Sequence, residues 1–148
     1  MKRMLLTFLL VIAAVAAAQE KRAITFDDLI ALQRLSDPQI SPDGTTIAFV
    51  GTSFNKAENT SNSNIFLVGG GPVVQLTRAL KRNAEPRWMS DGSSLAFVSN
   101  RDGASQIWSI PIRGGEARKI SSISTEASGL LVSPAGAHIV FASEVYPD

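Results

Sequence analysis

A ten-residue pattern recurs three times along the chain and constrains its fold more than any other feature. In each copy a short turn ends in glycine and is followed by an apolar, strand-like segment. The turn glycines, Gly44, Gly92 and Gly136, are 48 and 44 residues apart. A period of about 20 to 50 residues is typical of repeat architectures. The three copies are Ser41–Val50, Met89–Val98 and Ser133–Ala142.

Each copy predicts two antiparallel strands joined by a tight turn. Proline or serine followed by aspartate or alanine and then glycine suits a type I turn, most clearly at Ser41–Gly44. In the second strand of the pair both alternating sets of side chains are apolar or small, which favours a strand covered on both faces. The expected first strands are 38–41, 86–89 and 129–132, and the expected second strands are 45–51, 93–99 and 137–143.

A second half-repeat follows the first two copies and predicts two further strands in each unit. It comprises Asn64–Gly70 with Val73–Thr77, and Gln106–Ile110 with Ala117–Ser121. Asp102-Gly103 predicts a hairpin turn between the halves of the second unit, whereas 51–63 in the first unit predicts a longer polar loop.

Four short strands in each unit of 44 to 48 residues predict an all-β fold, a partial β-propeller. Residues 38–148 hold blades 1 and 2 and the first half of blade 3, about two and a half four-stranded blades. A propeller needs at least about four blades, so we expect the chain to be a fragment of a longer protein.

The N-terminus predicts a secretory signal peptide over residues 1–18. Lys2 and Arg3 precede an apolar run from Met4 to Val15, and three alanines end at Ala18. The alternative is an uncleaved anchor, but the run is short of the ~20 residues of a spanning helix. We therefore expect a periplasmic or secreted protein. The chain contains no cysteine, so no disulfide stabilises it.

Residues 19–37 form the lead-in to the repeats and predict one short helix within Ile24–Leu35. Thr25 can cap its N-terminus, and Asp28 falls in the favourable first turn. Asp37-Pro38 should end it, because a residue before proline is disfavoured in the helical region.

Two segments carry a family resemblance. Pro86–Trp108 with Gly114–Ser121 resembles the TolB-type propeller repeat. The lead-in, Ile24–Leu29 with Leu35–Gly44, is similar to the start of propellers in secreted serine peptidases of the prolyl oligopeptidase family, the acylaminoacyl and dipeptidyl peptidase types. That second resemblance implies a propeller that gates short peptide substrates over a C-terminal α/β-hydrolase domain. We expect no such domain within these 148 residues.

No complete catalytic site is expected in the chain itself. The pentapeptide G-x-S-x-G of a hydrolase nucleophile does not occur, and Gly92-Ser93-Ser94 and Gly103-Ala104-Ser105 come nearest. His138 is the single histidine, and we expect a partly exposed strand residue there. One histidine and no cysteine argue against zinc. We predict no catalytic, cofactor-binding or metal residue and no cofactor.

Several other motifs have structural explanations. Asp27 and Asp28 suit a helix start, and Asp43, Asp91 and Asp102 each precede a turn glycine without the spacing of a calcium loop. Gly69–Gly71 lacks the lysine of a phosphate loop, and Asn59–Ser61 matches a weak glycosylation sequon. Trp88 and Trp108 are expected inside blade interfaces. Phe49, Phe97 and Phe141 each stand five residues after a turn glycine and are expected to occupy equivalent buried places in successive blades.

The charge balance argues against nucleic acid as a partner. Without Lys2 and Arg3 the chain carries 12 basic and 13 acidic residues, so it has no basic excess. After signal cleavage no membrane association is expected. The expected partners are the hydrolase domain implied by the resemblance and peptide substrates. The alternative hypothesis is a non-catalytic periplasmic propeller like TolB, and in that case the expected partners are other proteins.

Overall fold

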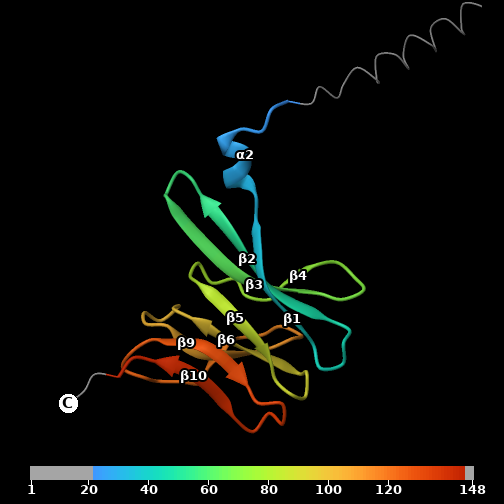
Figure 1. The fold of residues 1–148 in the computed structure, drawn as a ribbon, viewed down its shortest axis with the longest axis vertical. Helices are drawn as coiled ribbons and strands as arrows, with labels where there is room; N and C mark the ends of the chain where they lie inside the picture. The colour runs from blue at the N-terminus through green and yellow to red at the C-terminus, as the bar shows by residue number, and fades with distance from the viewer. Residues whose placement is uncertain (1–21, 146–148) are drawn as a thin grey trace, which may run out of the picture.

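Three antiparallel sheets follow one another along the chain in the computed structural model, which describes residues 22–145 (Figure 1). Blade 1 comprises β1 (Arg34–Ile40), β2 (Ile47–Asn55), β3 (Thr60–Val68) and β4 (Val74–Gln75). Blade 2 comprises β5 (Asn83–Trp88), β6 (Ser94–Ser99), β7 (Gln106–Pro111) and β8 (Arg118–Lys119). Blade 3 comprises β9 (Ala127–Val132) and β10 (Ile139–Ser143). The predicted partial propeller of two full blades and a half blade is confirmed. The predicted signal peptide, residues 1–18, lies outside the described residues.

The repeated turn has the same geometry in all three blades. The amide of Gly44 donates to the Ser41 carbonyl oxygen at 2.9 Å, and the equivalent bonds at Gly92 and Gly136 measure 2.9 and 2.8 Å. The three glycines have φ between 68° and 73°, which favours glycine because it has no side chain. The hairpin turn predicted at Asp102-Gly103 is also confirmed, since the Gly103 amide donates to the Asn100 carbonyl oxygen at 3.2 Å.

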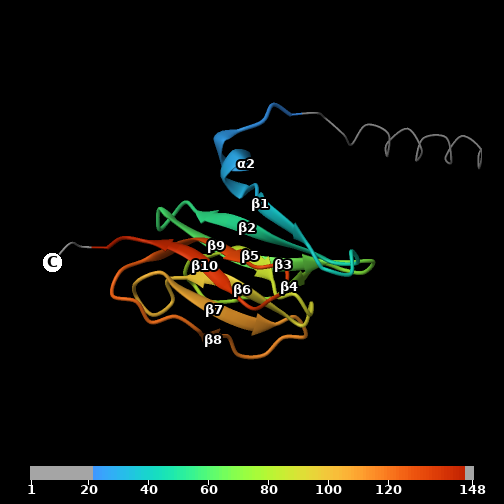
Figure 2. The same ribbon diagram turned by 60° about the horizontal axis from the view of Figure 1, so that its bottom comes forward.

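The core lies in the two interfaces between neighbouring sheets, which stack face to face in Figure 2. We call each of these interfaces a seam. Ala48 and Ile65 of blade 1 pack against Leu95 and Phe97 of blade 2, and Trp108 belongs to the same cluster. On the other face of blade 2, residues including Ala96 and Val98 pack against blade 3. Blade 2 is therefore covered on both faces, as the apolar pattern of its second strand predicts.

The lead-in helix is shorter than predicted. Helix α2 spans Phe26–Ala31 rather than extending toward Leu35, and Leu32 is already extended. Its N-terminus is as expected, a capping box in which Thr25 and Asp28 bond to each other's backbone amides. Strand β1 begins at Arg34, ahead of the predicted Pro38, because pairing with β2 replaces a helix that would be marginal alone. Asp37-Pro38 therefore lies within an edge strand, where proline is tolerated.

The polar loop predicted over 51–63 is wrong. Strands β2 and β3 continue through this segment as a long hairpin, paired without interruption from Ile47 with Val68 to Asn55 with Thr60. The serine, threonine and asparagine side chains that suggested a loop lie on a hairpin that extends beyond the stacked sheets toward α2 (Figure 1). The hairpin contacts α2 through an ion pair between Lys56 and Asp27. Within residues 22–145 no helix has the length and apolar character to cross a membrane.

Candidate functional site

A bulge recurs in the first strand of each blade, at the position seven residues before the turn glycine. Pairing with the second strand shifts at this point in all three sheets. Asp37, Glu85 and Gly129 occupy the position and have φ of 48°, 55° and 62°. Only glycine adopts this left-handed conformation freely, so aspartate and glutamate are held there at a cost in backbone strain. Non-glycine outliers of this kind often accompany a specific contact.

The two acidic bulge residues contact the next blade. The carboxylate of Asp37 accepts from the guanidinium of Arg87 at 2.9 Å, and both side chains are mostly shielded from solvent. The carboxylate of Glu85 accepts from the backbone amide of Leu130 at 2.9 Å. The indole of Trp88 adds a bond to the Gln39 carbonyl oxygen at 3.0 Å. Strands β1, β5 and β9 are thus joined in series, while β4 and β8 lie at the far edges of their sheets.

A second polar linkage crosses the seam between blades 1 and 2. Asn83 is fully buried, and its amide nitrogen donates to the Asn64 side chain at 3.2 Å and to the Lys81 carbonyl oxygen at 3.1 Å. Its amide oxygen accepts from Ser99 and from Arg101. Arg101 also stacks over the Trp108 ring at 4.7 Å, and burial lowers the pKa of its guanidinium.

The corresponding linkage between blades 2 and 3 uses a longer side chain. Ala127 stands where Asn83 stands in blade 2, so it cannot supply an amide. Gln106, at the position of Asn64, instead reaches the carbonyl oxygens of Ile123 and Thr125 at 2.9 and 3.3 Å. The side chain of Gln106 is one methylene longer than that of Asn64. Its amide nitrogen can therefore supply the hydrogen bonds for which Ala127 has no donor.

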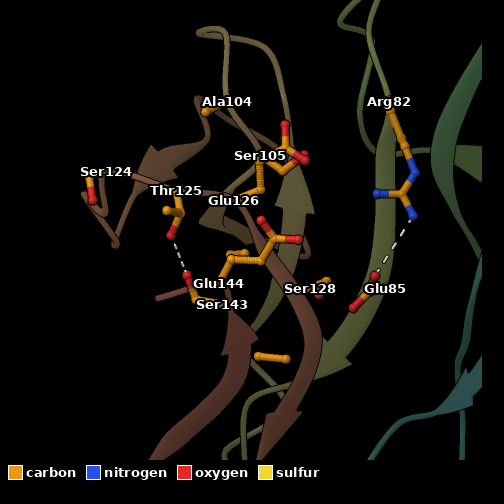
Figure 3. Close-up of a pocket in the computed structure, with 12 residues that line it drawn as sticks. Arg82, Glu85, Ala104, Ser105, Ser124, Thr125, Glu126, Ser128, Ser143 and Glu144 are labelled. Carbon is orange, nitrogen blue, oxygen red and sulfur yellow. Dashed lines mark hydrogen bonds and ion pairs between the residues drawn. The ribbon is translucent and has the colours of Figure 1, made fainter. Parts of the chain in front are cut away.

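A polar hollow of about 680 Å³ lies between blades 2 and 3 (Figure 3). It opens at the end of the sheets where β5 and β9 begin and where β10 ends. The hydroxyls of Thr125 and Ser143 bond to each other at 2.5 Å, and Arg82 pairs with Glu85 at 3.7 Å. The lining side chains are Arg82, Glu85, Ser105, Ser124, Thr125, Glu126, Ser128, Ser143 and Glu144, with three alanines.

The single histidine lies away from this hollow. His138 is exposed and lies between the turn and β10, directly before the strand in which it was predicted. Strand β10 has 5 residues and spans about 17 Å at ~3.3 Å per residue. His138 and the hollow are at opposite ends of this strand. An imidazole at that distance cannot accept a proton from Ser105 or Ser143.

The two serines nearest to a nucleophile motif have structural surroundings. Ser94 is the first residue of β6, and Ser105 is buried directly before β7. Neither is followed by a helix, because within the described part of the chain the helix α2 lies far upstream. Among residues 22–145 no group of three or more metal-binding side chains is present.

The acidic residues of the turns and of the helix start serve local hydrogen bonds. The Arg22 guanidinium, 2.6 Å from Asp28, holds the pKa of that carboxyl well below its usual range. A bond from the Ser41 hydroxyl lowers the pKa of Asp43, and a bond from the Ser93 hydroxyl lowers that of Asp91. These carboxylates are already occupied by neighbours in the sequence, which leaves them poorly suited to a shared ligand.

The remaining motifs lie at the surface or in the seams. Asn59 is exposed at the tip of the long hairpin, and Gly69–Gly71 connects β3 to β4. Trp108 is 7% exposed and Trp88 packs against the same cluster, which confirms both as interface residues.

The contacts that the two acidic bulge residues make with the next blade were not predicted from the sequence. One signal was available: an acidic residue followed by proline stands seven positions before the turn glycine in two of the three repeats, as Asp37-Pro38 and Glu85-Pro86. The partner of Asp37, Arg87, is 50 residues away in the sequence and carries no local signal.

Comparison with known proteins places the repeats in a family. The model of the TolB beta propeller domain matches residues 11–146. The uncharacterized peptidase YuxL of Bacillus subtilis is 41% identical over 123 residues, which cover 81% of this chain and 19% of that protein. The acylaminoacyl peptidase of Pyrococcus horikoshii has a similar structure, with a TM-score of 0.61, 20% identity, and coverage of 74% of this chain and 17% of that one.

A TolB structure shares the same fold. TolB from Acinetobacter baumannii aligns with a TM-score of 0.52 and 17% identity, covering 74% of this chain and 37% of that one. The chain spans less than a fifth of the length of the curated peptidases that it matches. The repeated turn, the stacked sheets and the family match over most of the sequence agree, and the chain belongs to the TolB beta propeller domain family.

Proposed function

We propose that the chain is the N-terminal propeller portion of an exported serine peptidase of the prolyl oligopeptidase family. In this proposal the propeller limits access to short peptides and orients them over an α/β-hydrolase domain that follows in the sequence. One observation carries it: the chain aligns with under a fifth of peptidases several times its length. The remainder of such a protein has room for further blades and a hydrolase domain.

The geometry of the sheets supports an assignment of which end would face the hydrolase domain. Strands β1, β5 and β9 each start at the same end, because each begins a meander of the same direction. Helix α2 precedes β1 at this end, and the polar hollow opens there as well. We propose that peptides pass this end of the propeller on their way to the catalytic serine.

The second candidate is a non-catalytic periplasmic propeller that binds protein partners. The fold shared with TolB favours it. The reading frame beyond Asp148 separates the two candidates. A G-x-S-x-G motif followed by aspartate and then histidine supports the peptidase. A frame that ends after about four more blades contradicts the peptidase and supports the second candidate.

Export is a separate part of the proposal and has its own test. The three alanines after a short apolar run favour cleavage after Ala18 by signal peptidase. Mass spectrometry of exported protein should therefore find Gln19 as the first residue. A mature protein that still begins at Met1 would contradict export with cleavage.

A further inference from the structure

Three Asp-Gly pairs of the chain lie in equivalent turns. In Asp43-Gly44, Asp91-Gly92 and Asp102-Gly103 the glycine amide donates to the carbonyl oxygen three residues earlier, at 2.9, 2.9 and 3.2 Å. Aspartate before glycine forms a succinimide readily, because glycine has no side chain to obstruct attack by its amide nitrogen on the neighbouring carboxyl carbon. The three turns therefore allow this reaction to be compared at three places in one molecule.

The carboxylates of the first two pairs are held by hydrogen bonds within their turns. Asp43 accepts from the Thr45 amide at 3.1 Å and from the Ser41 hydroxyl at 2.6 Å. Asp91 accepts from the Ser93 amide at 3.0 Å and from the Ser93 hydroxyl at 2.7 Å. These bonds lower the pKa of both carboxyls, so the protonated form, which can lose water, is scarce. They also direct each carboxylate to the amide two residues on and away from the glycine amide.

The carboxylate of Asp102 makes no such bond to any described residue. Ala104 stands two positions after Asp102, where the other two turns have a threonine or a serine, so it offers no hydroxyl. The partner of the carboxylate is Lys119, whose ammonium lies 3.5 Å away, and the side chains of Asp102 and Lys119 are 52% and 36% exposed. An exposed ion pair of this kind is weak. Gly103 has a φ of 109°, and no atom beyond its chain neighbours lies within 4 Å of where a Cβ would be, which leaves room for a ring.

We propose that Asp102 is a modification site at which the folded chain isomerises spontaneously to isoaspartate. The amide nitrogen of Gly103 bonds to the side-chain carboxyl carbon of Asp102, and the carboxyl hydroxyl leaves as water with the amide proton. A water molecule then opens the succinimide at its α-carbonyl carbon. The main chain now runs through the former side-chain carboxyl carbon, and an α-carboxylate is released. The product has the same composition and a main chain that is one methylene longer. This inference does not rest on the proposed function.

The lengthened turn carries residues that hold both seams. Arg101, directly before Asp102, donates to the side-chain oxygen of Asn83 at 2.8 Å, and Asn83 links blade 2 to blade 1. The carbonyl oxygen of Ser105, three residues after Asp102, accepts from the amide of Ala127 in blade 3 at 2.8 Å. An added methylene between these two residues displaces one or both contacts. Isomerisation should therefore loosen the seams and lower the stability of the chain.

Ageing of the 148-residue chain in buffer and in concentrated urea tests this proposal. The aged samples are denatured and digested with endoproteinase Asp-N, which cleaves before aspartate but not before isoaspartate, and the peptides are measured by mass spectrometry. In buffer we expect cleavage before Asp102 to be lost faster than cleavage before Asp43 or Asp91. In urea the turn hydrogen bonds are broken, so cleavage at all three positions should be lost at similar rates.

Matched variants test the physical cause. Ala104→Ser supplies the missing hydroxyl and should slow the reaction at Asp102, whereas Ser93→Ala removes one and should speed the reaction at Asp91. Asp102→Glu keeps a carboxylate for Lys119 but closes the larger ring far less readily. After ageing, the urea midpoint of the unmodified chain should fall and that of Asp102→Glu should stay where it was.

The other outcomes overturn the proposal. Equal rates at the three aspartates in buffer would mean that the folded turns do not select the site. A faster reaction at Asp102 that persists in urea would assign the difference to the local sequence rather than to the fold. A chain that is converted at Asp102 and keeps its urea midpoint would refute the effect on the seams.

Discussion

Replacing Phe97 by alanine tests the central seam at its most buried residue. Phe97 is 0% exposed and packs with Leu95 and Trp108 between blades 1 and 2. Truncation of a phenylalanine in such a site typically costs about 3 to 5 kcal/mol, from lost burial and from the cavity that remains. The Arg101 guanidinium lies 5.3 Å from the Phe97 ring centre, and loss of this contact adds about 0.5 to 1 kcal/mol.

The repeat supplies a matched control at the same position of another blade. Phe49 has the same register as Phe97, since each pairs with an aromatic residue of the third strand, but it lies on the face of blade 1 that points away from blade 2 and is only half-buried. Phe49→Ala should cost about 1 to 2 kcal/mol in proportion to the apolar area that it loses. Ser94→Ala, at the start of the same strand as Phe97, should change stability by less than about 0.5 kcal/mol.

Urea denaturation followed by tryptophan fluorescence measures all three variants. We expect the largest fall in midpoint for Phe97→Ala, a smaller one for Phe49→Ala and almost none for Ser94→Ala. If Phe97→Ala cost no more than Phe49→Ala, the seam would not be the core, and the stacked arrangement of the blades would be refuted.

Three further substitutions each test one contact of the structure. Glu85→Gln should speed hydrogen exchange of the Leu130 amide, since a neutral amide is a weaker acceptor than the carboxylate; unchanged exchange in a folded variant would rule out that bond as an inter-blade clamp. The pKa of Asp91 is lowered in the folded state, so the stability that it contributes is present above its unfolded pKa and is lost as pH falls through the folded value. Asp91→Asn should therefore flatten the fall in stability below about pH 4, and an unaltered acid limb of the pH profile would contradict this. Gly51→Ala should destabilise the chain by about 1 to 3 kcal/mol, because a Cβ there would lie 2.6 Å from the Phe66 ring; a midpoint within error of the unmodified chain would show that the ring moves aside freely.

The repeat made much of the fold predictable. The turns at Gly44, Gly92 and Gly136 were evident because a tight turn that ends in a left-handed glycine is a local property of the sequence. The burial of Phe97 was predicted because both alternating faces of its strand are apolar. Phe49 and Phe141, expected to be equally buried, are half-buried: Phe49 lies on the face of blade 1 that points away from blade 2, and Phe141 belongs to a sheet with two described strands.

The remainder depends on contacts that the local sequence does not encode. The β2–β3 hairpin contains glycine and asparagine residues with weak strand preference, and pairing between the strands overrides that preference. The left-handed bulges at Asp37 and Glu85 oppose the usual backbone preference of both residue types, and their bonds to the next blade accompany that strain. The helix after Thr25 was predicted with the correct start and the wrong end, because β1 pairing rather than a local stop signal ends it.

Labelling with a fluorophosphonate probe tests most directly the claim that this propeller serves a serine peptidase. The protein encoded by the full reading frame and the 148-residue chain are treated side by side. We expect that the longer protein is labelled, that replacing its G-x-S-x-G serine by alanine abolishes the label, and that the 148-residue chain is not labelled. Labelling of the 148-residue chain that disappears in Ser105→Ala, or a longer protein that takes no label, would contradict the proposal that this propeller serves a serine peptidase.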